Sequence, residues 1–384
     1  MATMTATMIH VESMQTAVPT RITGAGRTLP VAVSGGEAAP LTAASLQRRF
    51  RAVLYYRGVE QLQAEEEEEE RAVWVKESLS ASLADHPEMA GRLRRRDDDD
   101  DGGRRMWEVR LNDNGVRLVQ ASVDMPMSAF LEAKDQARRE AALALWTDVD
   151  VHEPEFCAPF FMQLTRFQDG GYAIGASCSL LLADPVSLVD FLKAWARTHA
   201  EMRVRGKPVA PPAVVQYARY LQTPGAAAAV VRRRLKSVPL DSCSAAATTV
   251  LFRAAAVAGA QVDRHALAAA CVDQAVETLG GNARKPPRLT VLAAGGSGEL
   301  RVEACGYGDG EETTTTMAAP PSRGHHALRA AYWGDLGLGE IALDGSEPVH
   351  VSCTVVSPCA DEGLVVVMAP AAAGELLISV TVPN

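Results

Sequence analysis

Side chains that could do chemistry gather in residues 171–199. Cys178 and Ser179 end an apolar run, Asp184 follows them, and His199 closes the stretch. Neither nucleophile lies in a G-x-S-x-G elbow, and apolar neighbours favour a packed small side chain over a reactive one. The stretch therefore offers nucleophile, carboxylate and histidine, but packing is the favoured interpretation of Cys178 and Ser179.

The histidines and cysteines do not follow a metal-binding pattern. His325-His326 is the only adjacent histidine pair, and no further ligands stand at suitable spacing. The seven cysteines are scattered and contain no C-x-x-C pair, which favours reduced thiols. The sequence thus predicts no metal site and no permanently bound cofactor.

The elements that must position these residues are a strand, a turn and a helix. Residues 171–179 read as a strand with a buried apolar run at 172–176, and apolar residues then recur at helical spacing from residue 186. Asp184 suits the N-cap of that helix and Pro185 its first position. A second short segment, Asp335-Leu336-Gly337-Leu338-Gly339, is a glycine-punctuated loop that fits either a tight turn or a ligand cradle.

Composition excludes several classes of protein. The acidic runs Glu65–Glu70 and Asp97–Asp101 hold eleven of the 47 acidic residues, and they account for the whole net charge of −9. The remainder is nearly neutral, so a nucleic-acid partner is not expected. The first residues do not resemble a signal peptide, and no apolar stretch is long enough for a transmembrane helix. These features predict a cytoplasmic protein, and the glutamate run is expected in a solvated loop.

Strand and helix patterns mix in both halves, which predicts an α/β (mixed α+β) fold rather than strict βαβ alternation. Residues 1–20 show little pattern, and residues 21–45, rich in Gly, Pro, Ala and Thr, read as a loop. Asp113-Asn114-Gly115 predicts a hairpin between strands 107–111 and 116–121. Helices are expected over 73–83, 129–145, 263–279 and 325–332, and further strands over 160–167, 249–254, 288–293, 299–304, 349–356, 364–368 and 376–382.

Taken in order, these segments resemble the BAHD family of plant acyl-CoA-dependent acyltransferases. The resemblance rests on GVRLVQA at 115–121, PFFMQLTRFQDGGYAIG at 159–175, ACVDQAVETLG at 270–280 and the loop at 335–339. FRAAAV at 252–257 is similar to the eceriferum-type branch. The resemblance implies two pseudo-equivalent, chloramphenicol-acetyltransferase-like domains at 1–200 and 248–384, joined by a crossover at 201–247.

The family's H-x-x-x-D motif falls on residues 180–184 and departs from the family pattern at its histidine. Leu180 stands at the position of the general base, Asp184 matches the structural aspartate, and Pro185 replaces a glycine. In the family's D-F-G-W-G loop, Asp335, Gly337 and Gly339 match, while Leu336 and Leu338 replace the aromatic residues. Leucine has no proton-accepting atom, so the resemblance implies a scaffold without its usual base.

The resemblance leaves three hypotheses of function open. The first is an auxiliary protein of very-long-chain fatty-acid and wax metabolism, a monomer with acyl-CoA as a ligand or co-substrate. A fatty-acid elongation enzyme would be its partner and could associate it with the endoplasmic reticulum. The second is an active O- or N-acyltransferase using His199, His325 or His326 as the base. The third is a degraded paralogue without function.

Overall fold

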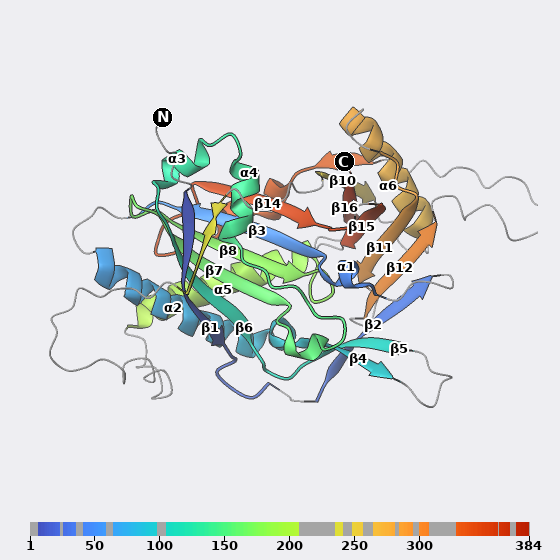
Figure 1. The fold of residues 1–384 in the computed structure, drawn as a ribbon. Helices are drawn as coiled ribbons and strands as arrows, with labels where there is room; N and C mark the ends of the chain where they lie inside the picture. Colours follow the sequence, from blue (N-terminus) through green and yellow to red (C-terminus); the bar gives the residue numbers. More distant parts are fainter. Residues whose placement is uncertain are drawn as a thin grey trace, which may run out of the picture.

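The computed structural model describes residues 7–23, 26–35, 41–58, 64–97, 105–206, 235–240, 248–255, 264–280, 284–294, 299–306, 328–359, 361–368 and 374–383 of the 384-residue chain. These residues form two mixed β-sheets with helices packed against them (Figure 1). His325, His326 and most of the predicted crossover, 207–234 and 241–247, lie outside the described residues. The mixed α/β fold class predicted from the sequence is confirmed.

Sheet A holds the stretch that carries Leu180. Among the described residues it has seven strands, with β8 between β3 and β7. β8 pairs antiparallel with both neighbours, and β6 pairs parallel with β7. In spatial order the strands are β14 (His350–Val356), β3 (Arg49–Tyr56), β8 (Tyr172–Ser179), β7 (Phe160–Arg166), β6 (Val116–Val123), β1 (Met8–Ala17) and β9 (Lys236–Pro239).

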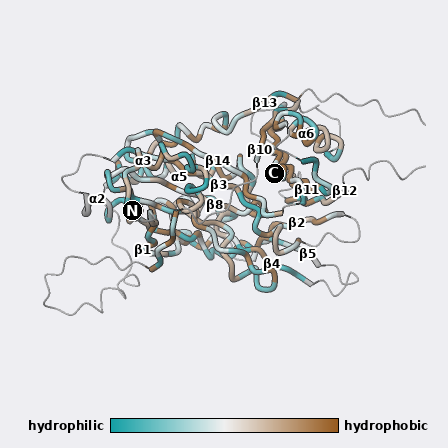
Figure 2. Tube along the Cα trace, turned by 45° about the horizontal axis from the view of Figure 1, so that its top comes forward, coloured by the Kyte–Doolittle hydropathy of each residue, from teal (hydrophilic) through white to brown (hydrophobic). Residues whose placement is uncertain are grey.

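Sheet B lies beside it and has nine described strands. Its centre pairs β11 with β15 in parallel and β15 with β16 antiparallel. Figure 2 shows hydrophobic stretches along β10 and the neighbouring strands. In spatial order the strands are β13 (Arg329–Ala331), β10 (Thr248–Ala255), β16 (Glu375–Val382), β15 (Glu362–Met368), β11 (Arg288–Ala294), β12 (Leu300–Gly306), β2 (Thr28–Gly35), β5 (Arg105–Arg110) and β4 (Arg92–Asp97).

The two sheets exchange strands across the halves of the sequence. β14, from the C-terminal half, forms an edge of sheet A, while β2, β4 and β5, from the N-terminal half, extend sheet B. Each sheet is therefore built from both halves of the chain. The domain boundaries at 200 and 248 stay a prediction about sequence ranges rather than a division between the sheets.

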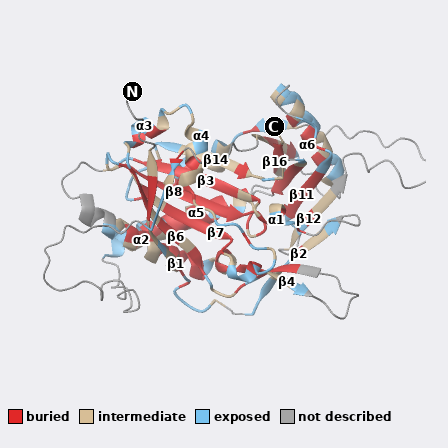
Figure 3. Ribbon diagram, viewed as in Figure 1, coloured by how far each residue is buried: buried red, intermediate tan, exposed pale blue. Residues whose placement is uncertain are grey.

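Helices complete the layers. α2 (Ala64–Asp85) and α5 (Pro185–Arg205) pack on each other, and their apolar side chains meet one face of sheet A. α3 (Met127–Leu131), α4 (Gln136–Arg139) and the turn after them cover the opposite face, where Tyr55 and Phe130 are buried. α6 (Arg264–Leu279) packs on the outer face of sheet B. Figure 3 shows the buried strands of sheet A, with β8 buried along its whole length.

One apolar cluster contains side chains from both sheets. In β15, Leu364, Val366 and Met368 join the same apolar cluster as Phe50 of β3, whereas Val365 and Val367 pack under α6. Successive residues of a strand point to opposite faces, so β15 separates two cores. The shared cluster joins the two sheets.

The predicted hairpin at 113–115 is wrong. β5 belongs to sheet B and β6 to sheet A, so the loop between them carries the chain from one sheet to the other. Gly115 has φ +74°, and a Cβ there would lie 2.1 Å from the carbonyl oxygen of Ala17. The buried Arg92 guanidinium donates to the carbonyls of Asn114 and Gly115 at 3.0 and 2.9 Å. Tertiary contacts, rather than a two-residue turn, hold this loop.

The helix predicted over 129–145 is also wrong as one element, since it divides into α3, α4 and a 3-10 turn at Glu140–Leu143. The reason is close packing on sheet A. The carbonyl oxygen of Leu143 would lie 1.9 Å from a Cβ on Gly175. Buried Glu140 also accepts a hydrogen bond from the Tyr55 hydroxyl at 3.0 Å. A continuous helix would not place both groups on the strand surface.

Three further expectations differ from the structure. In the N-terminal region, β1 occupies residues that showed little pattern, and β2 and α1 (Ala43–Leu46) occupy residues expected in a loop. The run Glu65–Glu70 belongs to the start of α2 instead of a loop. Residues 329–331, predicted as helix, form β13, because they pair with β10 at the edge of sheet B. The other predicted strands and helices occur within a few residues of their expected ranges, except that α2 begins nine residues before the predicted residue 73.

Candidate functional site

The turn after β8 is built around Ser179. Its carbonyl accepts from the amides of Leu182 and Ala183 at 2.9 and 3.1 Å, and its hydroxyl accepts from the Leu181 amide at 3.2 Å. Ser179 and Cys178 are fully buried, and burial raises the pKa of the Cys178 thiol far above its ordinary value. Both side chains therefore serve packing and turn geometry rather than nucleophilic attack.

Asp184 and Pro185 start α5. The Asp184 carboxylate accepts from the Ser187 amide at 2.8 Å and caps the helix, while Pro185 occupies its first turn. Burial raises the pKa of Asp184, and its hydrogen bonds with Ser187 act in the opposite direction. Its local contribution in the structure is therefore to the start of the helix.

Leu180 follows β8 directly and is 1 % exposed, within the core shared by both sheets. Its amide donates to the carbonyl of Arg48 at 3.1 Å. The side chain carries only carbon and hydrogen, so it neither accepts a proton nor polarises a carbonyl. The position that the family resemblance assigns to the base is a packing position in this chain.

Arg48 is a buried cation that the sequence analysis did not single out. Its side chain is 3 % exposed, forms a 2.7 Å ion pair with Glu362 of β15, and donates to the Cys359 sulfur at 3.4 Å. The Thr290 hydroxyl donates to the other oxygen of the Glu362 carboxylate. The signal in the sequence was Arg48-Arg49 directly before an apolar strand, where a charge beside a buried strand requires a partner.

The loop at 335–339 lies against the middle of α5. Gly337 has φ +72°, a conformation that favours glycine, and a Cβ there would lie 2.7 Å from the Lys193 ammonium nitrogen. The Asp335 carboxylate accepts from Arg253 of β10 at 3.1 Å, and this hydrogen bond is the main cause of its lowered pKa. Asp335 thus ties the loop to sheet B. The place beside Gly339 is open.

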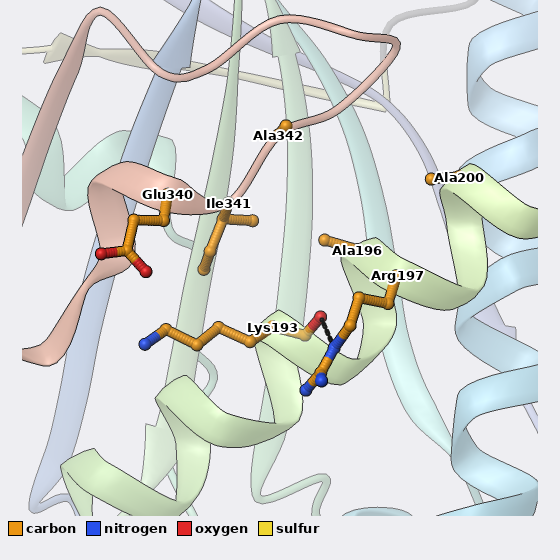
Figure 4. Close-up of a pocket in the computed structure, with 7 residues that line it drawn as sticks. All are labelled: Lys193, Ala196, Arg197, Ala200, Glu340, Ile341 and Ala342. Carbon is orange, nitrogen blue, oxygen red and sulfur yellow. Dashed lines mark hydrogen bonds between the residues drawn. The ribbon is translucent and has the colours of Figure 1, made fainter.

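A pocket of about 380 Å³ lies between α5 and the residues that follow this loop (Figure 4). Lys193, Arg197 and two alanines line it from the helix, and Glu340, Ile341 and Ala342 line it from the loop. Arg197 donates to the Lys193 carbonyl at 3.3 Å. Residue 193 stands eight positions after the start of α5, about 12 Å along the helix. The pocket is therefore separate from the Leu180 turn.

His199, one candidate for an alternative base, is buried at 1 % exposure. Its Nδ1 lies 3.1 Å from the Ser78 hydroxyl and its Nε2 lies 3.2 Å from Asp344. Arg71 and Arg203 also bind the Asp344 carboxylate. Burial opposes ionisation of Asp344, but the hydrogen bond and charge of His199 and the charge of Arg203 outweigh it and lower the pKa to about 2. We call these five residues the Asp344 cluster.

Within the described ranges, no group of three or more His, Cys, Asp or Glu side chains is arranged to hold a metal ion. No helix in the part of the chain that the structure describes is long and apolar enough to cross a membrane.

The structure brings Asp184 and Pro185 together at the start of α5, and the 335–339 loop contacts the same helix further along, at Lys193.

Comparison with known proteins shows which family and which relatives this chain is similar to. A model described as "Transferase family" matches residues 48–237. Putrescine hydroxycinnamoyltransferase 3 of Oryza sativa subsp. japonica is 33 % identical over 144 residues, covering 38 % of this chain and 29 % of that protein. Protein ECERIFERUM 26-like of Arabidopsis thaliana is 30 % identical over 97 residues, covering 24 % and 21 %. The crystal structure of vinorine synthase aligns with 96 % of this chain and 94 % of its own, with a TM-score of 0.44 and 15 % identity.

The family model and the two curated relatives agree on one family. The chain belongs to the transferase family of the BAHD acyltransferases, as the sequence motifs predicted. The matched segments span less than a third of the length of either curated relative. The roles of Leu180, Asp184, Pro185, Asp335, Gly337 and Gly339 as counterparts of family motif positions stay predictions.

Proposed function

We propose that this chain is a BAHD-family protein that has lost the usual general base and acts as an auxiliary in acyl-lipid metabolism. Acyl-CoA would be its ligand, and an enzyme of very-long-chain fatty-acid elongation would be its partner in the cytoplasm, at the endoplasmic reticulum surface. The observation that carries the proposal is Leu180, buried at the position of the base in an otherwise complete strand, turn and helix. Similarity to an ECERIFERUM 26-like protein supports the branch.

The energetic argument is simple. A positioned general base contributes about 10²–10⁴-fold to the rate of a proton-transfer step. A leucine at this place supplies none of that factor. The residues that shape the turn and cap α5, Ser179 and Asp184, are retained. A chain that keeps the scaffold and lacks the base fits binding better than group transfer.

His199 does not supply the missing base. Both ring nitrogens already face partners, Ser78 and Asp344, and the ring is buried between α2, α5 and the loop after residue 341. It is fifteen residues into α5, roughly 20 Å along the helix from Asp184. The active acyltransferase hypothesis therefore gains no support from His199.

The test is turnover with a broad set of acceptors. The purified full chain would be mixed with long-chain acyl-CoA and a panel of alcohols and amines, and free CoA would be followed with a thiol reagent. We expect CoA release no faster than about a hundredth of the rate of an active family member measured in parallel. Release at a comparable rate with any acceptor would refute the proposal.

A further inference from the structure

A serine, a histidine and an aspartate from three neighbouring segments of sheet A form a hydrogen-bonded chain. The His10 ring of β1 has its Nδ1 2.8 Å from the Ser237 hydroxyl of β9 and its Nε2 2.6 Å from the Asp124 carboxylate. Asp124 directly follows β6, and β1 lies between β6 and β9 (Figure 1). We call Ser237, His10 and Asp124 the His10 triad.

The register of the strands brings the triad together. His10 stands opposite Ser237 of β9 on one side and opposite Ser122 of β6 on the other. Asp124 is two residues beyond Ser122, and alternate residues along a strand point to the same face of the sheet. The three side chains therefore share one face, and the Asp124 carboxylate reaches the imidazole nitrogen that Ser237 does not contact.

The pairing of β1 with β9 also determines where the Ser237 backbone points. The Leu240 amide donates to the Thr7 carbonyl at 3.1 Å, and Pro239 has no N–H to donate. Hydrogen-bonded and non-hydrogen-bonded pairs alternate along an antiparallel ladder, so His10 and Ser237 form a non-hydrogen-bonded pair, in which side chains lie closest. The Ser237 amide then points away from β1, toward the edge of sheet A that β9 forms among the described residues.

Burial and hydrogen bonding orient the imidazole as a base for Ser237. His10 is 3 % exposed, whereas Ser237 is exposed and the Asp124 side chain is half-exposed. A carboxylate only accepts hydrogen bonds, so Nε2 carries the proton that faces Asp124, and Nδ1 of the neutral ring accepts from the Ser237 hydroxyl. A serine bonded to a base that a third group orients is the arrangement of an activated nucleophile.

We propose that the His10 triad is a second chemical site, in which Ser237 takes the acyl group of an activated oxygen ester. Ser237 Oγ bonds to the ester carbonyl carbon as His10 Nδ1 takes the hydroxyl proton, and the Ser237 amide donates to the carbonyl oxygen. The bond to the leaving alcohol breaks, and the alcohol takes that proton from Nδ1. Water, activated by the same nitrogen, then releases the acyl group as a carboxylic acid and restores the serine.

The triad is far from Leu180. Its row across sheet A consists of His10, Ser122, Arg166 and Tyr172. Tyr172 is the first residue of β8, and Leu180 follows the last, eight residues or about 26 Å along the strand. Acylation of Ser237 is therefore independent of the missing base and goes beyond the auxiliary role proposed above.

The test is covalent labelling of the full chain with a biotinylated fluorophosphonate, which reacts with activated serines. Tandem mass spectrometry locates the labelled residues. We expect Ser237 to react at least about tenfold faster than Ser128, an exposed serine of α3. With 4-nitrophenyl acetate, the acetyl group should be recovered on Ser237. Labelling of Ser237 no faster than that of Ser128 would overturn the inference.

Variants test whether the histidine and the carboxylate activate the serine. His10→Gln keeps a side chain that can bond both neighbours but removes the base, and it should slow labelling of Ser237 about a hundredfold. Asp124→Asn keeps the size of the side chain and should slow labelling about tenfold or more, because an amide no longer fixes which ring nitrogen carries the proton. Ser128→Ala is the matched control and should leave the rate at Ser237 unchanged. An unchanged rate in both test variants, each folded by circular dichroism, would leave the triad with only a structural role between β1, β6 and β9.

Discussion

At the scale of single residues, the turn after β8 holds two residues with different contacts, Leu180 in the core and Asp184 at the start of α5. Asp184 accepts the Ser187 amide and starts a 21-residue helix, a task that depends only on a side-chain oxygen at the N-cap. Leu180 fills the core without contributing a polar atom. The start of α5 therefore depends on Asp184 and not on Leu180, so a leucine at position 180 leaves the helix cap intact.

The cap gives a first prediction. Asp184→Ala should lower the free energy of unfolding by about 0.5–2 kcal/mol, since the Ser187 amide loses its partner. Urea denaturation followed by circular dichroism measures the change. Asp184→Ser keeps an acceptor at the N-cap and should retain most of the stability. A loss as large in Asp184→Ser as in Asp184→Ala would show that capping is not what the carboxylate contributes.

A second residue-scale prediction concerns close approach of backbone. In Gly175→Ala the new methyl group would meet the Leu143 carbonyl 1.9 Å away, so either β8 or the segment after α4 must move. We expect a loss of about 3 kcal/mol or more in unfolding free energy. Gly334→Ala has open space and an ordinary φ, and it should change stability by less than about 1 kcal/mol. Similar losses in the two variants would contradict this account.

At the scale of elements, the Asp344 cluster joins α2, α5 and the loop that follows the 335–339 segment. Ser78 comes from α2, His199 and Arg203 from α5, and Asp344 from a turn where its own φ is +48°. The Trp195 indole also donates to Ser78 at 2.9 Å. A single carboxylate thus holds the loop onto the helix pair.

This cluster predicts a dependence of stability on pH. Because the pKa of Asp344 is lowered to about 2 in the folded chain, its ionised form stabilises the fold above its ordinary pKa. The contribution, about 1–2 kcal/mol after solvent screening, is lost as the pH falls from about 4 through 2. The difference in unfolding free energy between the wild type and Asp344→Asn should be smaller at pH 3 than at pH 6, because part of the contribution of the carboxylate is lost by pH 3. A constant difference would contradict the assignment.

At the scale of the whole molecule, strand exchange and a shared core couple the two sheets. β14 closes sheet A, β2, β4 and β5 extend sheet B, and Phe50 and Leu364 belong to one apolar cluster. We predict a single unfolding transition, because neither sheet is complete without strands from the other half of the chain. Tryptophan fluorescence and far-ultraviolet circular dichroism should give coincident urea midpoints. Two separated midpoints would show that the sheets unfold independently.

Local patterns predicted the parts of this fold that depend on local interactions. Apolar periodicity predicted the strand at 171–179, which is β8. N-cap chemistry predicted the cap at Asp184 and the helix that begins at Pro185. The order of strands did not follow, because pairing of β14 with β3 joins residues about 300 positions apart. The turn at 113–115 misled for the same reason, since Arg92 and Ala17, both distant in sequence, fix its path.

The candidate site was also predictable from the sequence only in part. The sequence alone predicts that Leu180 stands where the family motif has its histidine, and it also singles out Asp335 and Gly337. Arg48 belongs to no motif, and only the pairing of β3 with β8 brings it beside Leu180, whose amide bonds its carbonyl. Cross-strand neighbours of this kind depend on register, which a single sequence does not specify outside short hairpins.

The most direct measurement of the central claim is the rate of CoA release by Leu180→His relative to wild type, with acyl-CoA and the same panel of acceptors. Leu180→Asn is the control, because it places a polar side chain without a proton-accepting ring nitrogen at the same buried position. If the base is what the chain lacks, Leu180→His should exceed both wild type and Leu180→Asn by at least about tenfold, with all three folded by circular dichroism. Release by wild type as fast as by folded Leu180→His would contradict the account.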